Sequence, residues 1–399
     1  MKKLFRALLR FITYLLIIVT GILIMYYLLA PVYKFSGPVP FTGNKLYNPY
    51  QSIDSANWRK YNFQVQSKAW LGITDGRKNT NELIDSVYKV LGYDHVATSD
   101  YQKINIFGKD DSAYIPTYEH GYNIFKTHQV CINADKVLWV DLMFGQTLSM
   151  KQWILDQLSE HSEIVALAHP LLRHGYTIND MKYLTNYEAI EVLNNIRVSV
   201  AHWDAALSTG QIAYIISDDD AHDVLYSNDV GRRFTMINSL TLNRNEILSN
   251  LKKGASYGID FFRIDDEPMK DKAERSKYIP KLTSAKLIGD TLIVSVDANA
   301  LLFRFIGNNG EVLHVVENSD TALYVIEDTD PYVRTEIMFH DHSVMYLNPV
   351  LRYNGEFPKT LKTAEVDKSA TLRLRIVYFL VAIIIAYLFA RLRMRKKRK

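Results

Sequence analysis

Two uncharged, apolar segments near the ends of the chain restrict how its 399 residues can fold. The first covers residues 11–30, and its 20 residues match the length of helix that crosses a bilayer. The second covers residues 376–390 and has 15 residues, so it spans a bilayer only if Arg373, Arg375 and Arg391 extend their side chains to the interfaces. We therefore expect membrane-spanning helices at residues 11–30 and 374–390, with the rest of the chain folded between them.

The two short ends outside these segments are basic. Residues 1–10 and 391–399 together carry eleven Lys or Arg side chains and no acid. Because basic flanks stay in the cytoplasm, we expect both tails to be cytoplasmic and the main domain to lie in the periplasm of a bacterial inner membrane. A cleaved signal peptide is the alternative for the first segment, and a nucleic-acid patch is the alternative for the last tail. The formal net charge is +4, so the part between the tails is acidic, which argues against nucleic acid as a partner.

The region between the apolar segments changes character along its length. Residues 31–60 are rich in Tyr, Pro, Gly and Asn and predict a linker. Residues 61–264 alternate strand-like runs with amphipathic runs, the clearest being a helix over 79–91, which predicts an α/β domain with parallel strands. Residues 265–281 are charged and predict a second linker. Residues 282–368 contain short alternating runs, which predict a small antiparallel β-sandwich-like domain.

Acidic and histidine side chains follow or lie in several of the predicted strands: Glu119, His128, His169, Asp220 and His222. The carboxyl ends of parallel strands meet at one face of an α/β fold, so we expect these side chains to converge. Carboxylates and imidazoles are ligands of zinc and manganese. The pattern therefore predicts a metal site. The alternatives are chance spacing for the first three residues, and a polar turn with a capping aspartate for Asp220 and His222.

The order of these motifs resembles that of the PHP family, the polymerase and histidinol phosphatase domain, over residues 60–262. Ala168-His169-Pro170 resembles the family's His-Pro motif, and Asp220-Ala221-His222 resembles its closing Asp-x-His motif. Residues 79–99 resemble the approach to its Asp-His motif. The resemblance implies a distorted seven-stranded (β/α) barrel, up to three divalent metal ions and phosphoesterase activity. The chain would be a degenerate, membrane-anchored member.

The resemblance also implies which residues match the metal ligands. The second metal of the family has a complete set of matching residues: Glu119, His128 and His169. The first metal would be bound by Glu119 and Asp220, but Gln64 and Gln66 stand where the family has two histidines. Glutamine offers only a neutral amide oxygen, which is a poor substitute for imidazole on zinc or manganese.

The third metal of the family would be bound at positions that match Asp75, Tyr101 and His222. Tyr101 replaces a histidine, and a phenol with a pKa of about 10 ligates a metal only at a cost. We therefore expect one or two ions, zinc or manganese, rather than three. Two ions about 3.5–4 Å apart form the usual clamp for phosphoryl chemistry, and here the clamp is incomplete.

Two arginines follow the predicted ligands. Arg173 follows the His-Pro motif and Arg232 follows the closing motif, so each would bind the anionic group of a phosphorylated small molecule. Solvated surface arginine is the alternative for both. Two functions remain open. One is a periplasm-facing, PHP-like metal-dependent phosphoesterase with weak or absent hydrolysis. The other is a non-catalytic scaffold or ligand-binding ectodomain in a membrane-protein complex.

Overall fold

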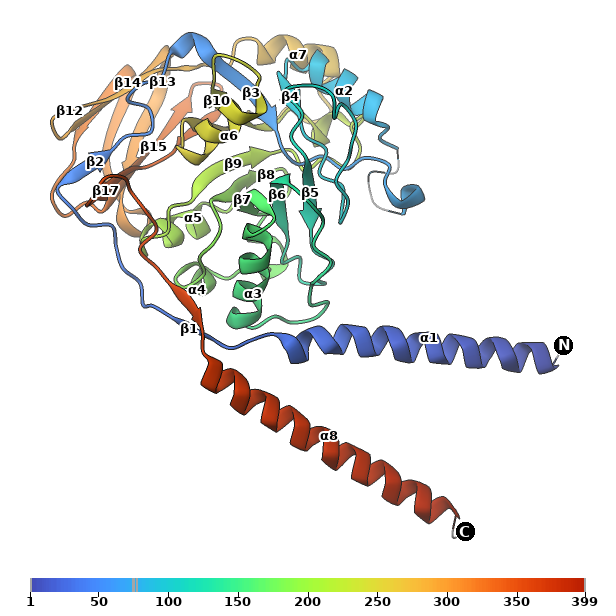
Figure 1. Cartoon of the computed structure of the whole chain (residues 1–399). Coiled ribbons are helices and arrows are strands. Elements are labelled where there is room, and N and C mark those ends of the chain that lie inside the picture. Colours follow the sequence, from blue (N-terminus) through green and yellow to red (C-terminus); the bar gives the residue numbers. More distant parts are fainter. Residues whose placement is uncertain (1, 74–75, 77, 398–399) are drawn as a thin grey trace.

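The structure is a computed structural model that describes residues 2–73, 76 and 78–397. It has a mixed α/β body from which two long terminal helices project (Figure 1). The α-helices among these residues are α1 (Lys2–Leu29), α2 (Asn81–Val90), α3 (Leu148–Ser159), α4 (Ile178–Met181), α5 (Val200–Leu207), α6 (Arg244–Lys252), α7 (Met269–Ser276) and α8 (Lys368–Lys397). The mixed α/β class that the sequence predicts is confirmed.

One sheet has five strands in sequence order: β5 (Thr117–His120), β6 (Gln129–Ala134), β7 (Ser162–Leu167), β8 (Ala189–Asn194) and β9 (Tyr214–Asp218). The pairs β5–β6 and β6–β7 are antiparallel, whereas β7–β8 and β8–β9 are parallel. The carboxyl ends of β5, β7, β8 and β9 and the amino end of β6 therefore share one edge. This edge is where the sequence places its acidic and histidine side chains.

A second sheet has eleven strands: β2 (Lys45–Tyr47), β3 (Trp58–Asn62), β4 (His95–Val96), β10 (Arg233–Asn238), β11 (Ser256–Asp260), β12 (Leu282–Ile288), β13 (Thr291–Ile306), β14 (Val312–Val325), β15 (Tyr332–Phe339), β16 (Val344–Leu347) and β17 (Val350–Tyr353). Two isolated parallel bridges link it to the five-stranded sheet. One joins Val65, which follows β3, to Ala221, which follows β9. The other joins Tyr101, which follows β4, to Glu119 of β5. The closed seven-stranded barrel stays a prediction.

The late β strands continue the sheet of the α/β part. Strand β16 pairs with β11 in antiparallel register, from Tyr257 opposite Leu347 to Asp260 opposite Val344. A single buried apolar cluster contains Phe303 of β13 together with residues of β10 and α2. Residues 265–281, which the sequence predicts to be a linker, are partly helical in the structure. That segment contains α7, whose Lys272 is buried and donates to the carbonyl oxygen of Val230 at 3.0 Å.

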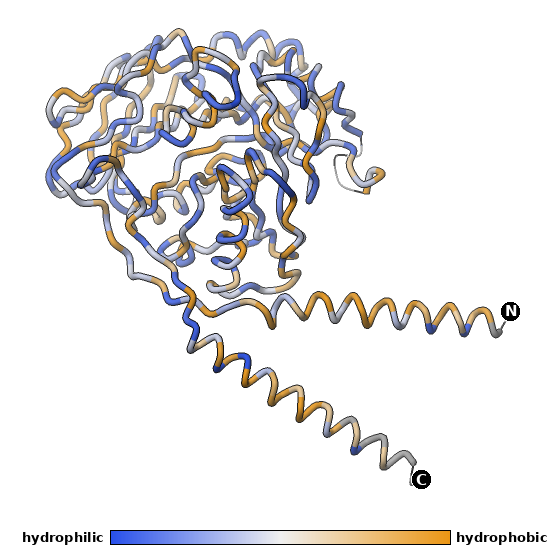
Figure 2. Tube along the Cα trace, in the orientation of Figure 1, coloured by the Kyte–Doolittle hydropathy of each residue, from blue (hydrophilic) through white to orange (hydrophobic). Residues whose placement is uncertain are grey.

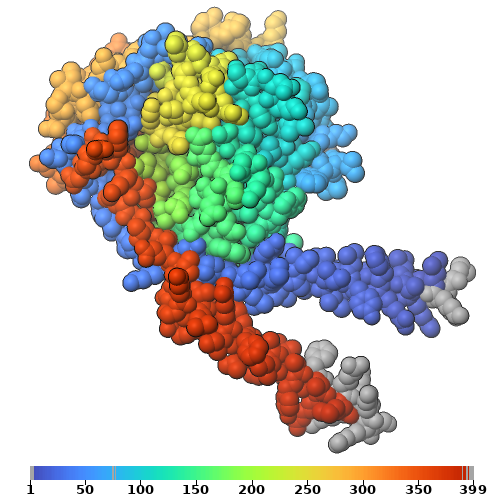
Figure 3. Space-filling model, viewed as in Figure 1, coloured from blue at the N-terminus to red at the C-terminus, as the bar shows by residue number. Residues whose placement is uncertain are grey.

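The two terminal helices are long and apolar enough to cross a membrane, by length and composition, over Leu4–Leu29 and Lys368–Leu388. Most of their residues are apolar (Figure 2), and both helices project from the body, with the inner end of α1 packed against it (Figure 3). Strands β1 (Tyr33–Phe35) and β18 (Ala364–Val366) pair in antiparallel register and join the inner ends of the helices. The amide of Val32 donates to Thr371 Oγ1 at 3.0 Å, so both helices leave the body from one place.

Candidate metal site

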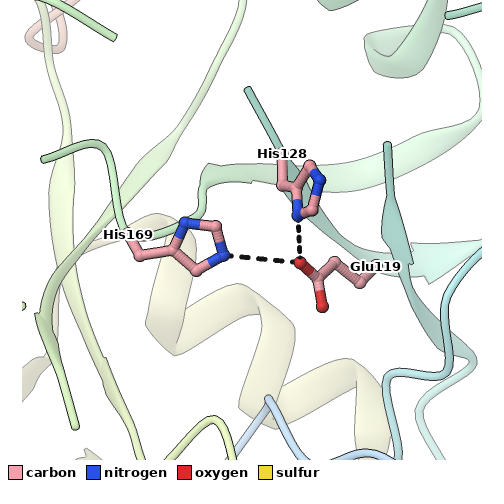
Figure 4. A group of neighbouring side chains, drawn as sticks. All are labelled: Glu119, His128 and His169. Atoms are coloured by element: carbon pink, nitrogen blue, oxygen red, sulfur yellow. Dashed lines mark hydrogen bonds and ion pairs between the residues drawn. The ribbon is translucent and has the colours of Figure 1, made fainter. Parts of the chain in front are cut away.

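Three of the predicted ligands meet at the shared edge of the five-stranded sheet (Figure 4). Glu119 lies in β5, His128 directly precedes β6, and His169 follows β7. The antiparallel β5–β6 pair places the residue before β6 beside the end of β5. Gly121 allows this approach, because a Cβ atom there would lie 2.5 Å from the ring of His128.

The three side chains are buried and their ligand atoms lie close enough for one ion. His128 Nδ1 is 2.6 Å and His169 Nε2 is 3.4 Å from Glu119 Oε1. All the candidate ligand atoms lie within 4.8 Å of one another. Metal–ligand bonds of about 2.0–2.2 Å bring the ligands of one ion to a similar separation. Two imidazoles and a carboxylate are also a donor set that suits zinc or manganese.

The charges of the three residues, which we call the Glu119 cluster, compensate one another. Burial alone would raise the pKa of Glu119, but His128 and His169 together hold it below its usual value. Burial lowers the pKa of His128, although Glu119 opposes this. Burial also acts to lower the pKa of His169, but its hydrogen bond to Glu119 and the charge of Asp220 raise it overall. The ionised Glu119 and the neutral His128 match the protonation state that a metal ion requires, and metal binding would displace any proton that the raised pKa keeps on His169.

His169 is held in an uncommon backbone conformation with φ of 29°. Its amide donates to Glu191 Oε2 at 2.6 Å, and Glu191 Oε1 in turn accepts from Asn194 Nδ2 at 2.9 Å. Such strained residues persist where the surroundings over-determine them, which is common at functional sites. The sequence analysis did not identify Glu191. The available signal was one acidic residue inside the apolar strand β8.

The three consecutive aspartates after β9 have different surroundings. Asp218 Oδ1 accepts the amide of Phe63 at 2.6 Å. Asp219 accepts the amides of residues 231–233, the shortest at 2.7 Å, and therefore fixes a loop. Asp220 has φ of 50°, and its Oδ2 accepts from Asn194 Nδ2 at 3.0 Å. Among the described residues, Asp220 Oδ1 has no hydrogen-bond partner.

Asp220 and His222 form a pair beside the Glu119 cluster, with His222 Nε2 3.8 Å from Asp220 Oδ1. Within the part of the chain that the structure describes, they are outside the three-residue group that one ion would join. Burial raises the pKa of Asp220, Asp218 and Glu191, and neighbouring carboxylates raise each further. We call these three carboxylates the Asp220 group. A buried acidic group of this kind, with an unpaired oxygen, fits a bound cation.

Two of the positions at which the sequence departs from the PHP pattern, Gln66 and Tyr101, contact the Glu119 cluster. Gln66 Nε2 donates to Glu119 Oε2 at 2.7 Å, so an amide occupies the second oxygen of that carboxylate. Gln64 is buried, and neither atom of its amide has a partner among the residues described. The ring of Tyr101 packs edge-on against His128, with ring centres 5.6 Å apart. Asp75 lies outside the described residues.

The two candidate anion-binding arginines are separated. Arg173 lines an open cavity of about 620 Å³ together with His128 and Lys126. Arg232 lies elsewhere, with its Nε 3.5 Å from Asp260 Oδ1 and its Nη1 3.5 Å from Asn195 Oδ1. The structure therefore brings Arg173, but not Arg232, to the wall of the cavity beside the Glu119 cluster. Lys126, which the sequence analysis did not single out, joins Arg173 there.

Comparison with known proteins gives little beyond this geometry. No protein-family model and no curated protein matches the chain. One solved structure, a two-domain protein from Bacteroides vulgatus described as containing a predicted PHP-like metal-dependent phosphoesterase, matches at 11% sequence identity and a TM-score of 0.38. The match covers 83% of this chain and 99% of that chain. A TM-score this low supports no argument about fold or activity, so the functional argument depends on the site.

Proposed function

We propose that the chain is a membrane-anchored, PHP-like phosphoesterase-type protein that holds one or two divalent ions and hydrolyses phosphate esters weakly or not at all. The observation that carries this proposal is the buried cluster of Glu119, His128 and His169 at one edge of the five-stranded sheet. Two imidazoles and a carboxylate whose ligand atoms lie within 4.8 Å of one another are a donor set that one divalent ion would use.

The residues around the cluster have distinct parts in this proposal. A divalent ion held by Glu119, His128 and His169 would supply Lewis-acid polarisation of a phosphoryl oxygen. Asp220, whose Oδ1 is unpaired among described residues, would accept a proton or help to hold a second ion. Lys126 and Arg173 on the cavity wall would neutralise the charge of a phosphate group.

The bond from Gln66 to Glu119 is the reason to expect weak turnover. Its amide donates to Glu119 Oε2, the oxygen left over by the two histidines. An amide hydrogen at that oxygen competes with a second ion, and the two-ion clamp for phosphoryl chemistry stays incomplete. The same bond favours the second candidate function, in which a non-catalytic scaffold or ligand-binding ectodomain acts in a membrane-protein complex.

The proposal also places the chain in a membrane. Helices α1 and α8 would span the bacterial inner membrane, and the body would face the periplasm. Support comes from the pairing of β1 with β18, which brings the inner ends of both helices together on one side of the body. A periplasm-only reporter enzyme fused after Lys399 should be inactive, and an active fusion would contradict this topology.

The function is tested with the full chain purified in detergent. Bound metal is measured, and hydrolysis of a phosphomonoester and a phosphodiester is assayed with added manganese or zinc. Slow metal-dependent hydrolysis that disappears in His169→Ala, but survives in His202→Ala, supports the enzyme. His202 is a matched control, because it is buried but bonds to the carbonyl of Tyr176 instead of the cluster. Metal binding without any hydrolysis favours the binding protein, and a folded, inert chain that binds no metal contradicts the phosphoesterase.

A further inference from the structure

Exposed apolar side chains lie in the cavity wall or next to it, and we call them the apolar rim: Trp70, Leu71, Ile73, Ile124, Trp139 and Phe144. Trp70, Ile124 and Trp139 line the cavity, Leu71 and Ile73 follow Trp70 in the chain, and the carbonyl of Phe144 accepts from the cavity residue Asn123. Leu71 is 99% exposed and Ile73 is 84% exposed, although both are apolar. Two contacts join parts of the rim: the rings of Trp70 and Trp139 lie 5.9 Å apart, and the amide of Ile124 donates at 2.9 Å to the carbonyl of Met143, the residue before Phe144. Exposed apolar side chains gathered around one cavity mark an interaction site.

The rim extends to the inner end of α1. The amide of Phe144 donates to the hydroxyl of Tyr27, a residue of the last helical turns, at 2.7 Å. In Figure 1 the short helix η2 (Trp70–Gly72) lies on the side of the body toward which α1 runs. If α1 crosses a bilayer, this hydrogen bond holds the Phe144 part of the rim beside the inner end of the span.

The composition of the rim suits the boundary of a bilayer rather than a protein partner. Tryptophan combines an apolar ring with an N–H donor and is enriched where lipid meets water. Trp70 and Trp139 are 44% and 54% exposed and stand at the cavity mouth. The fully exposed Leu71 would enter the acyl region beyond them, which would remove its apolar surface from water.

The cavity behind the rim has a cationic wall. Lys126 Nζ lies 5.4 Å from the centre of the Tyr101 ring, and Arg173 Nη1 donates to the carbonyl of Ile124 at 3.1 Å. Both residues line the cavity with His128, a member of the Glu119 cluster. An apolar mouth in front of two cations and a candidate metal site matches a molecule with apolar chains and an anionic head.

We infer that the apolar rim inserts into the membrane interface and that the cavity receives the phosphate headgroup of a membrane lipid. This inference deepens the proposed function, on which it rests, by naming the substrate class. Acyl chains would stay in the bilayer beneath Leu71 and Ile73. The headgroup would pass between Trp70 and Trp139 to Lys126 and Arg173.

Insertion is tested with the full chain in nanodiscs that contain lipids brominated on their acyl chains. Of the five tryptophans, Trp70 and Trp139 are at the rim, so bromine should quench mainly their emission. The double variant Trp70→Phe/Trp139→Phe should lose most of the quenching. Leu71→Gln should reduce it, whereas Leu240→Gln, an equally apolar loop residue outside the rim, should not. Quenching that is unchanged in the double variant would overturn the insertion.

The headgroup is tested by native mass spectrometry of the full chain in detergent, offered phosphatidic acid and phosphatidylcholine together. The wild type should retain phosphatidic acid in preference, and Lys126→Met/Arg173→Met should lose that preference by about tenfold or more. Equal retention of both lipids would overturn the lipid assignment. Equal competition by glycerol phosphate would show that a water-soluble ester suffices, and would also overturn it. Neither readout requires turnover, so failure of hydrolysis and failure of this inference are distinguishable.

Discussion

The Glu119 cluster and the Asp220 group lie at the same sheet edge but differ in how their charge is balanced. Glu119 accepts hydrogen bonds from Gln66 and contacts two imidazoles, which lower its pKa. Burial raises the pKa values of Asp220, Asp218 and Glu191, and the opposing charges of His222 and His169 do not reverse this for Asp220. The cluster is therefore stable without an ion, whereas the Asp220 group would gain most from one.

The difference lies in the partners of each carboxylate. At Glu119 the amide of Gln66 donates to Oε2, and two imidazoles contact Oε1. At Asp220, Oδ1 has no hydrogen-bond partner among the described residues, and His222 Nε2 lies 3.8 Å from it. Substitutions on the two sides should consequently change stability in opposite directions.

The largest effect on stability should come from removing the charge of Glu119. Glu119→Gln leaves His128 and His169 without their shared carboxylate, and we expect the free energy of unfolding to fall by about 3 kcal/mol, in the range for breaking one partner of a buried pair. Urea unfolding of the full chain without added metal measures this. Glu163→Gln, at an exposed pair with Lys252, is the control and should change little. An unchanged free energy of unfolding in Glu119→Gln would show that Glu119 and the two imidazoles do not stabilise one another.

Replacing the amide at Glu119 should move the site back toward two ions. Gln66→His removes the donor to Glu119 Oε2 and adds an imidazole at the same place, so bound metal should rise from one ion toward two. We expect hydrolysis to increase by about tenfold or more as the two-ion clamp forms. Gln66→Asn separates the two effects, because it withdraws the amide without adding a ligand. Equal gains in metal content and hydrolysis in the two variants would show that the added imidazole contributes nothing, and no gain in either variant would show that the amide does not limit metal binding.

Neutralising Asp220 should have the opposite sign to neutralising Glu119. Asp220→Asn removes a buried charge near Glu191 and Asp218, so the metal-free chain should become more stable by about 1 kcal/mol. The same variant should gain less stability from added metal than the wild type does. Thermal unfolding with and without zinc or manganese measures both quantities. A loss of stability in the metal-free variant would show that the charge of Asp220 is already balanced.

The smallest effect is the pH dependence of the metal-free chain. The raised pKa values of Glu191, Asp218 and Asp220 mean that the folded chain holds more protons than the unfolded chain above the usual carboxyl range. Stability should therefore fall as the pH rises from about 5, by about 1 kcal/mol or less. The lowered pKa of Glu119 works the other way, and its contribution disappears only as the pH falls through that low value. Asp220→Asn should reduce this loss of stability with rising pH. A free energy of unfolding that rises with pH in the metal-free wild type would contradict the raised pKa values.

The sequence predicted the strand ends well, because apolar runs before His169 and Asp220 identify the strands that carry them. It did not predict Glu191, whose importance depends on a bond to the backbone of His169. The bond from Gln66 to Glu119 joins residues 53 apart and depends on side-chain rotamers, which a linear pattern does not contain. The pairing of β16 with β11 was missed for a similar reason, since neighbours in a sheet need not be neighbours in sequence.

Helix α7 was missed because few of its residues are apolar. Met269 and Ala273 are the members that pack on the core, and the charged residues between them made the segment resemble a linker. The apolar rim was likewise invisible as a unit, because Trp70 and Trp139 are brought together only by the fold. Local patterns therefore predicted elements and most candidate ligands, while contacts between distant segments required the structure.

The central claim is that Glu119, His128 and His169 hold a divalent ion. Its most direct test is the metal content of the full chain, loaded with zinc or manganese, dialysed and analysed by inductively coupled plasma mass spectrometry. The wild type and His202→Ala should retain at least one ion per chain, and His169→Ala should lose metal affinity by more than about 100-fold, since even outer partners of ligands cost 10–100-fold. A wild type without metal, or a His169→Ala variant that retains it equally, would contradict the claim.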